Sequence, residues 1–195
     1  HLEIGSLEKA KNPVLLYASG ANTQIIAYDG GKYRVFGETL DIGIGNFLDN
    51  FGRELGLGFP AGPKIDEMAK KAKARNAKYI ELPYSVKGMD VSFSGMLTNL
   101  KQKIQNIKTE EEKENLCYSV QETIFAMLLE VSERAMAHCE KDELLLGGGV
   151  ACNSRLKEMS EIMCKERNAK LFIPEFQFLV DNAGMIGVLG IKMFN

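Results

Sequence analysis

The sequence from Val14 to Glu38 reads VLLYASGANTQIIAYDGGKYRVFGE. Two apolar runs flank the small polar turn Ser19–Asn22, and a second turn, Asp29–Gly31, leads into a third run. Runs rich in β-branched and aromatic residues, broken by Gly, Asn and Asp, are typical of an antiparallel meander. A Ser-Gly turn with free backbone N–H groups can also cradle a phosphate, although most such turns only reverse the chain. We therefore expect three strands and one candidate phosphate turn.

Composition places the chain among ordinary globular proteins. Its 195 residues are 45% hydrophobic and 26% charged, and a net charge of −2 argues against binding a polyanion over the whole surface. The densest basic run, Lys70 to Lys78, is the candidate for a local phosphate-backbone patch. The four cysteines form no CxxC pair, and no apolar run approaches the roughly 18 residues of a membrane span. We expect reduced thiols, no membrane association and a cytoplasmic location. Because the chain starts at His1 without Met, we also expect a fragment.

Helical periodicity follows the meander. In Asp41–Gly56 the apolar residues recur at the spacing of an amphipathic helix, with Asp49 and Arg53 as an exposed ion pair on its polar side. The Gly- and Pro-rich loop 57–63 precedes a second helix, near whose start Asp66 would complement the helix dipole.

The middle of the chain is also mostly helical in pattern. Ser94 would cap one helix, and Thr109 with Glu112 spells a capping box ahead of a long one. Glycines are few in this region compared with the flanks. The pattern predicts a helical subdomain over residues 58–141.

A strand followed by a glycine turn marks the return to an α/β pattern. The apolar residues 143–146 run into Gly147-Gly148-Gly149 and then into a helix. Glycines let a backbone approach a ligand closely, and the helix N-terminus then faces that ligand. This arrangement is typical of nucleotide sites.

A strand at 170–173 and a final helix, capped by Asp181-Asn182, complete the pattern. Glycines at 184, 187 and 190 leave one face of that helix almost bare, so we expect it to pack closely on the sheet or to admit a ligand. Together the elements predict an α/β nucleotide-binding lobe formed by residues 1–57 and 142–195.

Several separated motifs together resemble those of one protein family. They are HLEIG at 1–5, YASGANTQ at 17–24, GETLD at 37–41, GNFLD at 45–49, GFPAGP at 58–63, GGGVACN at 147–153 and DN at 181–182. In these the chain is similar to the tRNA N6-adenosine threonylcarbamoyltransferases, the TsaD or KEOPS-type proteins once called O-sialoglycoprotein endopeptidases. Tyr17 favours the archaeal and eukaryotic branch. The resemblance implies an actin-like ATPase (ASKHA) fold of two RNase H-like lobes around a nucleotide cleft. This chain would be the second lobe with its helical insert, and the preceding N-terminal lobe would be absent.

The same resemblance implies a metal site. Family members hold one metal ion through an HxxxH helix, a tyrosine and a late aspartate, and the matching residues are His1, Tyr17 and Asp181. The first histidine of the pair would lie four residues upstream of His1. Imidazole, phenolate and carboxylate ligands together suit iron or zinc.

The resemblance also implies a site for an adenylate, either threonylcarbamoyl-AMP or ATP. Asp49, Gly62 and Asp66 match adenosine- or ribose-side positions, and Asn153 matches a nucleotide-contacting asparagine. Carboxylates suit ribose because its hydroxyls donate hydrogen bonds. The remaining matches, around the phosphate-facing turn, are Tyr17, Ala18, Ser19, Gly20 and Ala21.

The activity implied by the resemblance is transfer of the threonylcarbamoyl group from threonylcarbamoyl-AMP to N6 of A37 in tRNAs that read ANN codons. The implied partners are tRNA and KEOPS-type subunits: a kinase/ATPase partner, a Pcc-type dimerising subunit and a further tRNA-binding subunit. Three alternatives stay open: an actin-like-fold ATPase or kinase, a metalloprotease, and a remnant without activity. HxxxH lacks the glutamate that serves as general base in HExxH proteases, which disfavours the metalloprotease.

Overall fold

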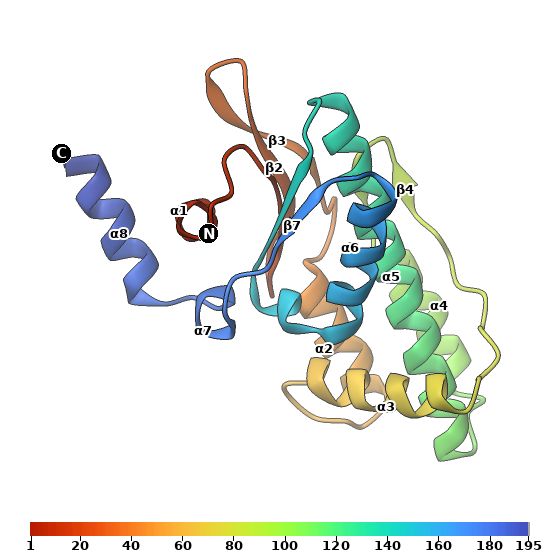
Figure 1. Ribbon diagram of the computed structural model, residues 1–195. Helices are drawn as coiled ribbons and strands as arrows, with labels where there is room; N and C mark the ends of the chain where they lie inside the picture. The colour runs from red at the N-terminus through yellow and green to blue at the C-terminus, as the bar shows by residue number, and fades with distance from the viewer. Residues whose placement is uncertain (195) are drawn as a thin grey trace.

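The computed structural model describes residues 1–194 and is organised around a five-stranded mixed sheet (Figure 1). The strands are β1 (Val14–Ala18), β2 (Thr23–Asp29), β3 (Lys32–Glu38), β6 (Glu143–Gly147) and β7 (Lys170–Phe172), in the order β3-β2-β1-β6-β7. The first three are antiparallel, whereas β6 and β7 run parallel to β1. The predicted meander is confirmed. Since Tyr17 pairs with Gly147, β1 and β6 end at the same level.

Helices and short turns make up most of the remaining chain. In chain order they are α1 (Leu2–Leu7), α2 (Ile44–Glu54), α3 (Gly62–Ala74), the hairpin β4 (Val86–Lys87) and β5 (Asp90–Val91), α4 (Ser94–Ile104), α5 (Glu110–His138), the 3-10 turn η1 (Gly149–Cys152), α6 (Ser154–Glu166), α7 (Phe176–Leu179) and α8 (Ala183–Phe194). None of the helices within residues 1–194 is both long and apolar enough to span a bilayer.

The core lies between one face of the sheet and the long helix α5. Val14, Leu16 and Ala18 of β1 alternate into this core, where they join the fully buried Ile124 and Phe125 of α5. Alternation is expected because successive side chains of a strand point to opposite faces. Each buried Leu, Ile or Phe contributes about 1.5–3 kcal/mol. The same core continues into α2 and α3, so the helical region and the sheet share one apolar interior.

The long helix begins at the predicted capping box. Thr109 Oγ1 accepts a hydrogen bond from the N–H of Glu112 at 3.2 Å, and the Glu112 carboxylate accepts one from the N–H of Thr109 at 3.0 Å. Two N–H groups at the helix start that would otherwise lack partners are satisfied in this way. The prediction from these two residues is confirmed.

Two predictions about side-chain contacts on helices are wrong. Asp49 does not pair with Arg53: its Oδ1 accepts a hydrogen bond from the N–H of Ala61 at 2.8 Å, while Arg53 donates to Asn50. Ser94 makes no side-chain cap for α4.

The start of α4 is instead satisfied from a distant loop. The carboxylate of Asp41 accepts hydrogen bonds from the N–H groups of Phe93 and Ser94, each at 2.9 Å. A carboxylate is a stronger acceptor than a hydroxyl, so the long-range cap replaces the local one. These backbone bonds outweigh the effect of burial, which by itself would raise the pKa of Asp41, and hold that pKa below its ordinary value.

For the final helix, the expected close packing on the sheet is also wrong, while access for a ligand stays a prediction. No residue of α8 is buried, and nothing described lies within 4 Å of a side chain built at Gly187 or Gly190. Figure 1 shows α8 projecting away from the sheet on the side of α1. The bare glycine face therefore makes no close packing contact with the sheet. The cap of α8 is Asn182, whose Oδ1 accepts from the N–H of Met185 at 2.9 Å, and not Asp181.

Candidate functional site

The turn after β1, at residues 19–22, and the glycine turn after β6, at residues 147–149, meet where these two strands end. Gly148 has a φ of +87°, and a Cβ at this position would lie 2.3 Å from the carbonyl oxygen of Ala18 and 3.0 Å from the nitrogen of Ser19. Only glycine tolerates both the backbone conformation and this approach. In open α/β sheets, ligands bind at the carboxyl ends of the parallel strands. The convergence therefore places both turns at the expected edge.

The turn after β1 is held rigidly. The Ser19 hydroxyl donates to the carbonyl of Asn22 at 3.0 Å. The carbonyls of Ser19 and Gly20 accept from the N–H groups of Gly45 and Asn46, at 3.1 and 2.9 Å. The turn thus caps α2, because the first N–H groups of a helix have no partner within it. The backbone of this turn is fixed before any ligand arrives.

A cavity of about 460 Å³ opens beside the two turns. Five of the predicted adenylate residues line it: Gly20, Asp49, Gly62, Asp66 and Asn153. They come from the β1–β2 turn, α2, α3 and the end of the glycine turn, so segments far apart in sequence form one wall.

The other four predicted residues do not line this cavity. Tyr17 and Ala18 end β1, while Ser19 and Ala21 belong to the turn that supports it. The remaining lining residues are Gly45, Leu48, Pro60, Pro63, Gly149, Val150, Cys152 and Phe176.

Asp66 carries an unused hydrogen-bond acceptor. Its Oδ2 accepts from the ammonium of Lys70 at 2.7 Å and from the hydroxyl of Ser154 at 3.3 Å. Its Oδ1 is buried and has no partner among residues 1–194. Buried polar atoms are almost always hydrogen-bonded, so an unpaired carboxylate oxygen in a cavity wall indicates a missing donor. A ligand hydroxyl or N–H would satisfy it.

Asn153 has a structural role that the sequence did not indicate. Its Oδ1 caps α6 by accepting from the N–H groups of Arg155 and Leu156, at 2.8 and 3.2 Å. Its Nδ2 donates to Oε1 of the buried Gln121 at 2.9 Å. Replacing an N-cap of this kind by Ala typically costs about 1 kcal/mol. Loss of binding in an Asn153 variant would therefore include a loss of helix stability.

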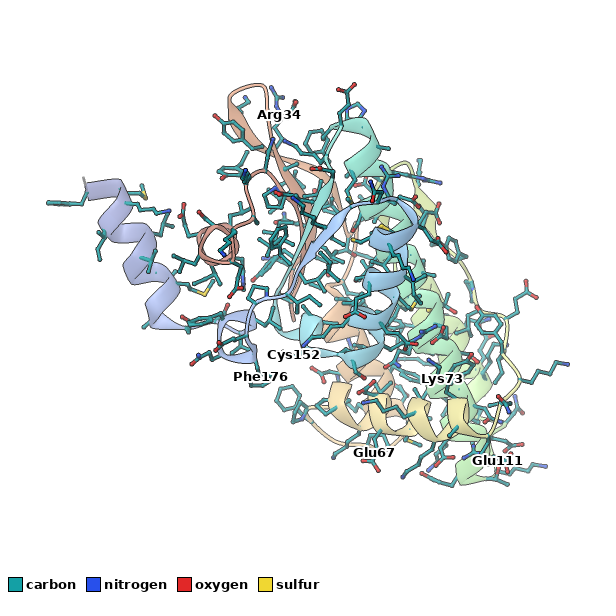
Figure 2. All side chains as sticks on the ribbon, viewed as in Figure 1. Arg34, Glu67, Lys73, Glu111, Cys152 and Phe176 are labelled. Carbon is teal, nitrogen blue, oxygen red and sulfur yellow. The ribbon has the colours of Figure 1, made fainter. Side chains whose placement is uncertain are left out.

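Cys152 and Phe176 are two of the eight lining residues that were not predicted as site residues from the sequence. Figure 2 shows them close together at the end of the sheet, above α3. Burial raises the pKa of the Cys152 thiol, which keeps it protonated near neutral pH. Phe176 is 69% exposed, an unusual state for an aromatic ring in a cavity wall. Because Cys152 lies inside the glycine motif, the sequence could have indicated it as a site residue, whereas no sequence pattern indicated Phe176.

The predicted metal ligands are brought together only in part. The His1 and Tyr17 rings lie 5.2 Å apart, and both ring nitrogens of His1 are buried without a partner in the described chain. These orphaned nitrogens fit a metal ion as a ligand. Asp181 is exposed and does not line the cavity that contains His1 and Tyr17. Its neighbour Val180 lies beside Gly149, at the glycine turn. Within residues 1–194, no three His, Cys, Asp or Glu side chains form a metal-binding group.

The basic run does not form a free cationic patch. Four of its five side chains are ion-paired: Lys70 with Asp66, Lys71 with Glu67, Lys73 with Glu158 and Arg75 with Glu114. Pairing neutralises the positive potential that a nucleic acid would meet.

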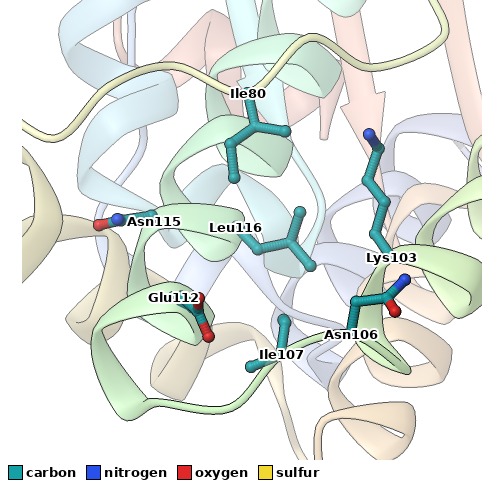
Figure 3. Close-up of a pocket in the computed structure, with 7 residues that line it drawn as sticks. All are labelled: Ile80, Lys103, Asn106, Ile107, Glu112, Asn115 and Leu116. Atoms are coloured by element: carbon teal, nitrogen blue, oxygen red, sulfur yellow. The ribbon is translucent and has the colours of Figure 1, made fainter.

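A separate cavity of about 280 Å³ lies between α4 and α5 (Figure 3). The side chains of Ile80, Ile107 and Leu116 point toward one another in it. Glu112, the charged residue on its α5 side, already serves the capping box described above. This cavity contains none of the predicted site residues.

Comparison with known proteins gives the family. The family model described as tRNA N6-adenosine threonylcarbamoyltransferase (TsaD) matches residues 1–188. The chain belongs to this family. The resemblance inferred from the motifs is confirmed.

Named relatives come from both archaea and eukaryotes. The tRNA N6-adenosine threonylcarbamoyltransferase of Thermococcus sibiricus is 55% identical over 195 residues, covering 100% of this chain and 58% of that protein. The protein of the same name from Danio rerio is 50% identical over 199 residues, again covering 100% and 58%. A probable bifunctional tRNA threonylcarbamoyladenosine biosynthesis protein of Methanobrevibacter smithii is 51% identical and is covered to 35%. The chain thus spans less than two thirds of the length of these relatives.

Solved structures share the fold at low identity. Component A of the Acidaminococcus fermentans (R)-2-hydroxyglutaryl-CoA dehydratase gives a TM-score of 0.56 at 11% identity, covering 88% of this chain and 59% of that one. Full-length HypF gives 0.54 at 11% identity, covering 85% and 37%. Both have actin-like ATPase folds, so the predicted fold class is confirmed.

Proposed function

We propose that the cavity beside the glycine turns binds the adenylate of threonylcarbamoyl-AMP or ATP, as part of a tRNA N6-adenosine threonylcarbamoyltransferase. The observation that carries the proposal is the unpaired Oδ1 of Asp66 in a cavity lined by four further predicted contacts. Membership of the family supports the reaction class. The division into a lobe (1–57 and 142–195) and an insert (58–141) belongs to the same proposal.

The residues of the chain would recognise the nucleotide through complementary hydrogen bonds. Asp66 Oδ1 accepts from a ribose hydroxyl, because it is the acceptor without a donor. The turn carrying Gly20, already fixed against α2, presents its backbone without reorganising. The exposed ring of Phe176 offers a face on which a base can stack.

His1 and Tyr17 would supply two of the protein ligands of an iron or zinc ion. Their adjacency and the orphaned nitrogens of His1 support this assignment, while Asp181 stays a predicted third ligand. When bound, such an ion supplies Lewis-acid polarisation of a carbonyl oxygen. The tRNA and the KEOPS-type subunits stay predicted partners of the whole protein.

The adenylate assignment is tested with Asp66→Asn and a neighbouring control. The amide removes the negative charge and one acceptor oxygen, so ATP affinity measured by titration calorimetry should fall about tenfold or more. Glu67→Gln is the control, since Glu67 lies on α3 next to Asp66 but points away from the cavity (Figure 2). Wild-type affinity in Asp66→Asn would refute the assignment. Transfer itself is measured by mass spectrometry of tRNA incubated with the full-length protein and threonylcarbamoyl-AMP.

A further inference from the structure

The segment that forms one wall of the cavity is tied to α5 by two polar contacts. The first is the bond from Asn153 Nδ2 to Oε1 of Gln121, a residue that is 3% exposed. The second is a bidentate ion pair: Nε and Nη2 of Arg155 donate to the two carboxylate oxygens of Glu122, each at 2.6 Å. Both contacts are made by the first residues after η1. They therefore hold the start of α6 at a defined place on α5.

The same arginine extends the connection to α3. Arg155 Nη1 lies 2.9 Å from Oε2 of Glu158, and the ammonium of Lys73 lies 3.0 Å from the same oxygen. Lys73, labelled in Figure 2, sits where α3 approaches α5 and α6. We call these four residues, Lys73, Glu122, Arg155 and Glu158, the Arg155 cluster. It joins α3, α5 and α6, and both α3 and the turn leading into α6 contribute residues to the cavity lining.

Burial and geometry separate the Glu122–Arg155 pair from the other ion pairs. The two side chains are only 16% and 17% exposed. A planar guanidinium that meets a carboxylate through two parallel hydrogen bonds fixes orientation as well as distance. The surface pair Lys71–Glu67 on α3, in contrast, leaves both side chains more than half exposed. The low exposure of both partners and the bidentate geometry suit the Glu122–Arg155 pair to set the position of a backbone segment.

We propose that Glu122 and Arg155 are positioning residues for the adenylate cavity. Acting together with the Gln121–Asn153 contact, the pair holds the turn 149–153 against α5 and so sets the distance between this turn and Asp66. Neither Glu122 nor Arg155 lines the cavity itself. The expected effect on ATP binding rests on the proposed function. The expected effect on the rigidity of the turn does not.

The chain offers a matched control for this pair. Arg167 and Glu133 also join α6 to α5, at 3.2 Å, but at the far end of α6 and away from the glycine turn. Glu122→Gln and Glu133→Gln therefore remove the same charge from the same helix pair. A purely structural role would change ATP binding and exchange in each variant only in proportion to its loss of stability, which should be larger for Glu122 because its side chain is 16% exposed against 46% for Glu133.

The experiment compares the two variants by ATP titration and by hydrogen exchange. We expect Glu122→Gln to weaken ATP binding at least fivefold and to speed exchange of the Ala151 and Asn153 amides at least tenfold, because their bonds to Gly148 and Val150 form the turn. Glu133→Gln should change neither. Equal effects of both variants, or none from Glu122→Gln, would overturn the inference.

A second variant and the hydrogen-exchange readout allow the inference to be tested even if Glu122→Gln does not fold or ATP does not bind. Should Glu122→Gln fail to fold, Arg155→Lys retains the charge but not the bidentate geometry, and should give smaller changes in the same direction. Unchanged binding and exchange in Arg155→Lys would also count against the proposal. If wild-type protein does not bind ATP, the proposed function fails, while hydrogen exchange still decides whether the pair positions the turn.

Discussion

The two faces of the central sheet differ in how completely they are packed. On one face, Ile124 and Phe125 of α5 share a buried core with β1, and the cavity with Asp66 forms at the edge of that packed layer. On the other face lie α1 and α8, and α8 has no buried residue. Five of the nine candidate adenylate residues line one cavity beside the packed layer, whereas of the three candidate metal ligands only His1 and Tyr17 lie close together. Candidate site residues are thus brought together where the elements that carry them are packed against one another.

A pair of phenylalanine truncations should give the largest difference between the two faces. Phe125 on α5 is fully buried, whereas Phe194 on α8 is 94% exposed. Phe125→Ala leaves a cavity in the core and should lower the free energy of unfolding by about 3–5 kcal/mol. Phe194→Ala should change it by less than about 0.5 kcal/mol. Urea denaturation measures both, and a comparable loss for the two variants would contradict the contrast between the faces.

A smaller effect is expected from two neighbouring glycines, Gly148 and Gly149, of which Gly149 lines the cavity. Gly148→Ala places a methyl group against the Ala18 carbonyl at a positive φ, so we expect a loss of about 2–3 kcal/mol in stability together with a displaced turn. At Gly149 a Cβ would have its nearest neighbour, Val180 Cγ1, at 3.8 Å, which is an ordinary contact. Gly149→Ala should therefore stay within about 1 kcal/mol of wild type. Equal stability of the two variants in denaturant would show that the turns do not abut as described.

The sequence predicted features whose causes are local. The meander follows from short apolar runs between turn residues, and the capping box at Thr109 depends on residues three apart. The glycine motif indicated a tight turn between a strand and a helix because a strand, three glycines and a helix lie in succession. These features can be predicted from the sequence because the residues that make the contacts are close to one another in the chain.

Features set by distant contacts were missed or wrongly predicted. Asp49 was expected to pair with Arg53 one turn away, but the N–H of Ala61 competes for it. Likewise, the cap of α4 comes from Asp41, more than fifty residues earlier. The Glu122–Arg155 pair joins residues 33 apart, and neither side chain stood out in the sequence. Such partners are decided by how helices pack, which hydrophobic periodicity does not specify.

The smallest predicted effect is a change in the alkylation rate of Cys152. Because burial raises the pKa of this thiol, its reactive thiolate is scarce at pH 7, and the rate with iodoacetamide should climb as pH rises toward and beyond the ordinary thiol pKa. Bound ATP should slow the reaction about threefold, since Cys152 lines the cavity.

Cys139 is the internal control for this measurement. Burial also raises its pKa and it is likewise partly exposed, but it lies at the end of α5 outside the cavity. Cys117 and Cys164 are buried, with pKa values raised to about 12 and about 11, so they should react least. Peptide mass spectrometry reports all four thiols in one sample. Protection of Cys139 and Cys152 to the same degree would indicate a general stabilisation by ATP, whereas protection of Cys152 alone locates the nucleotide on the packed side of the sheet.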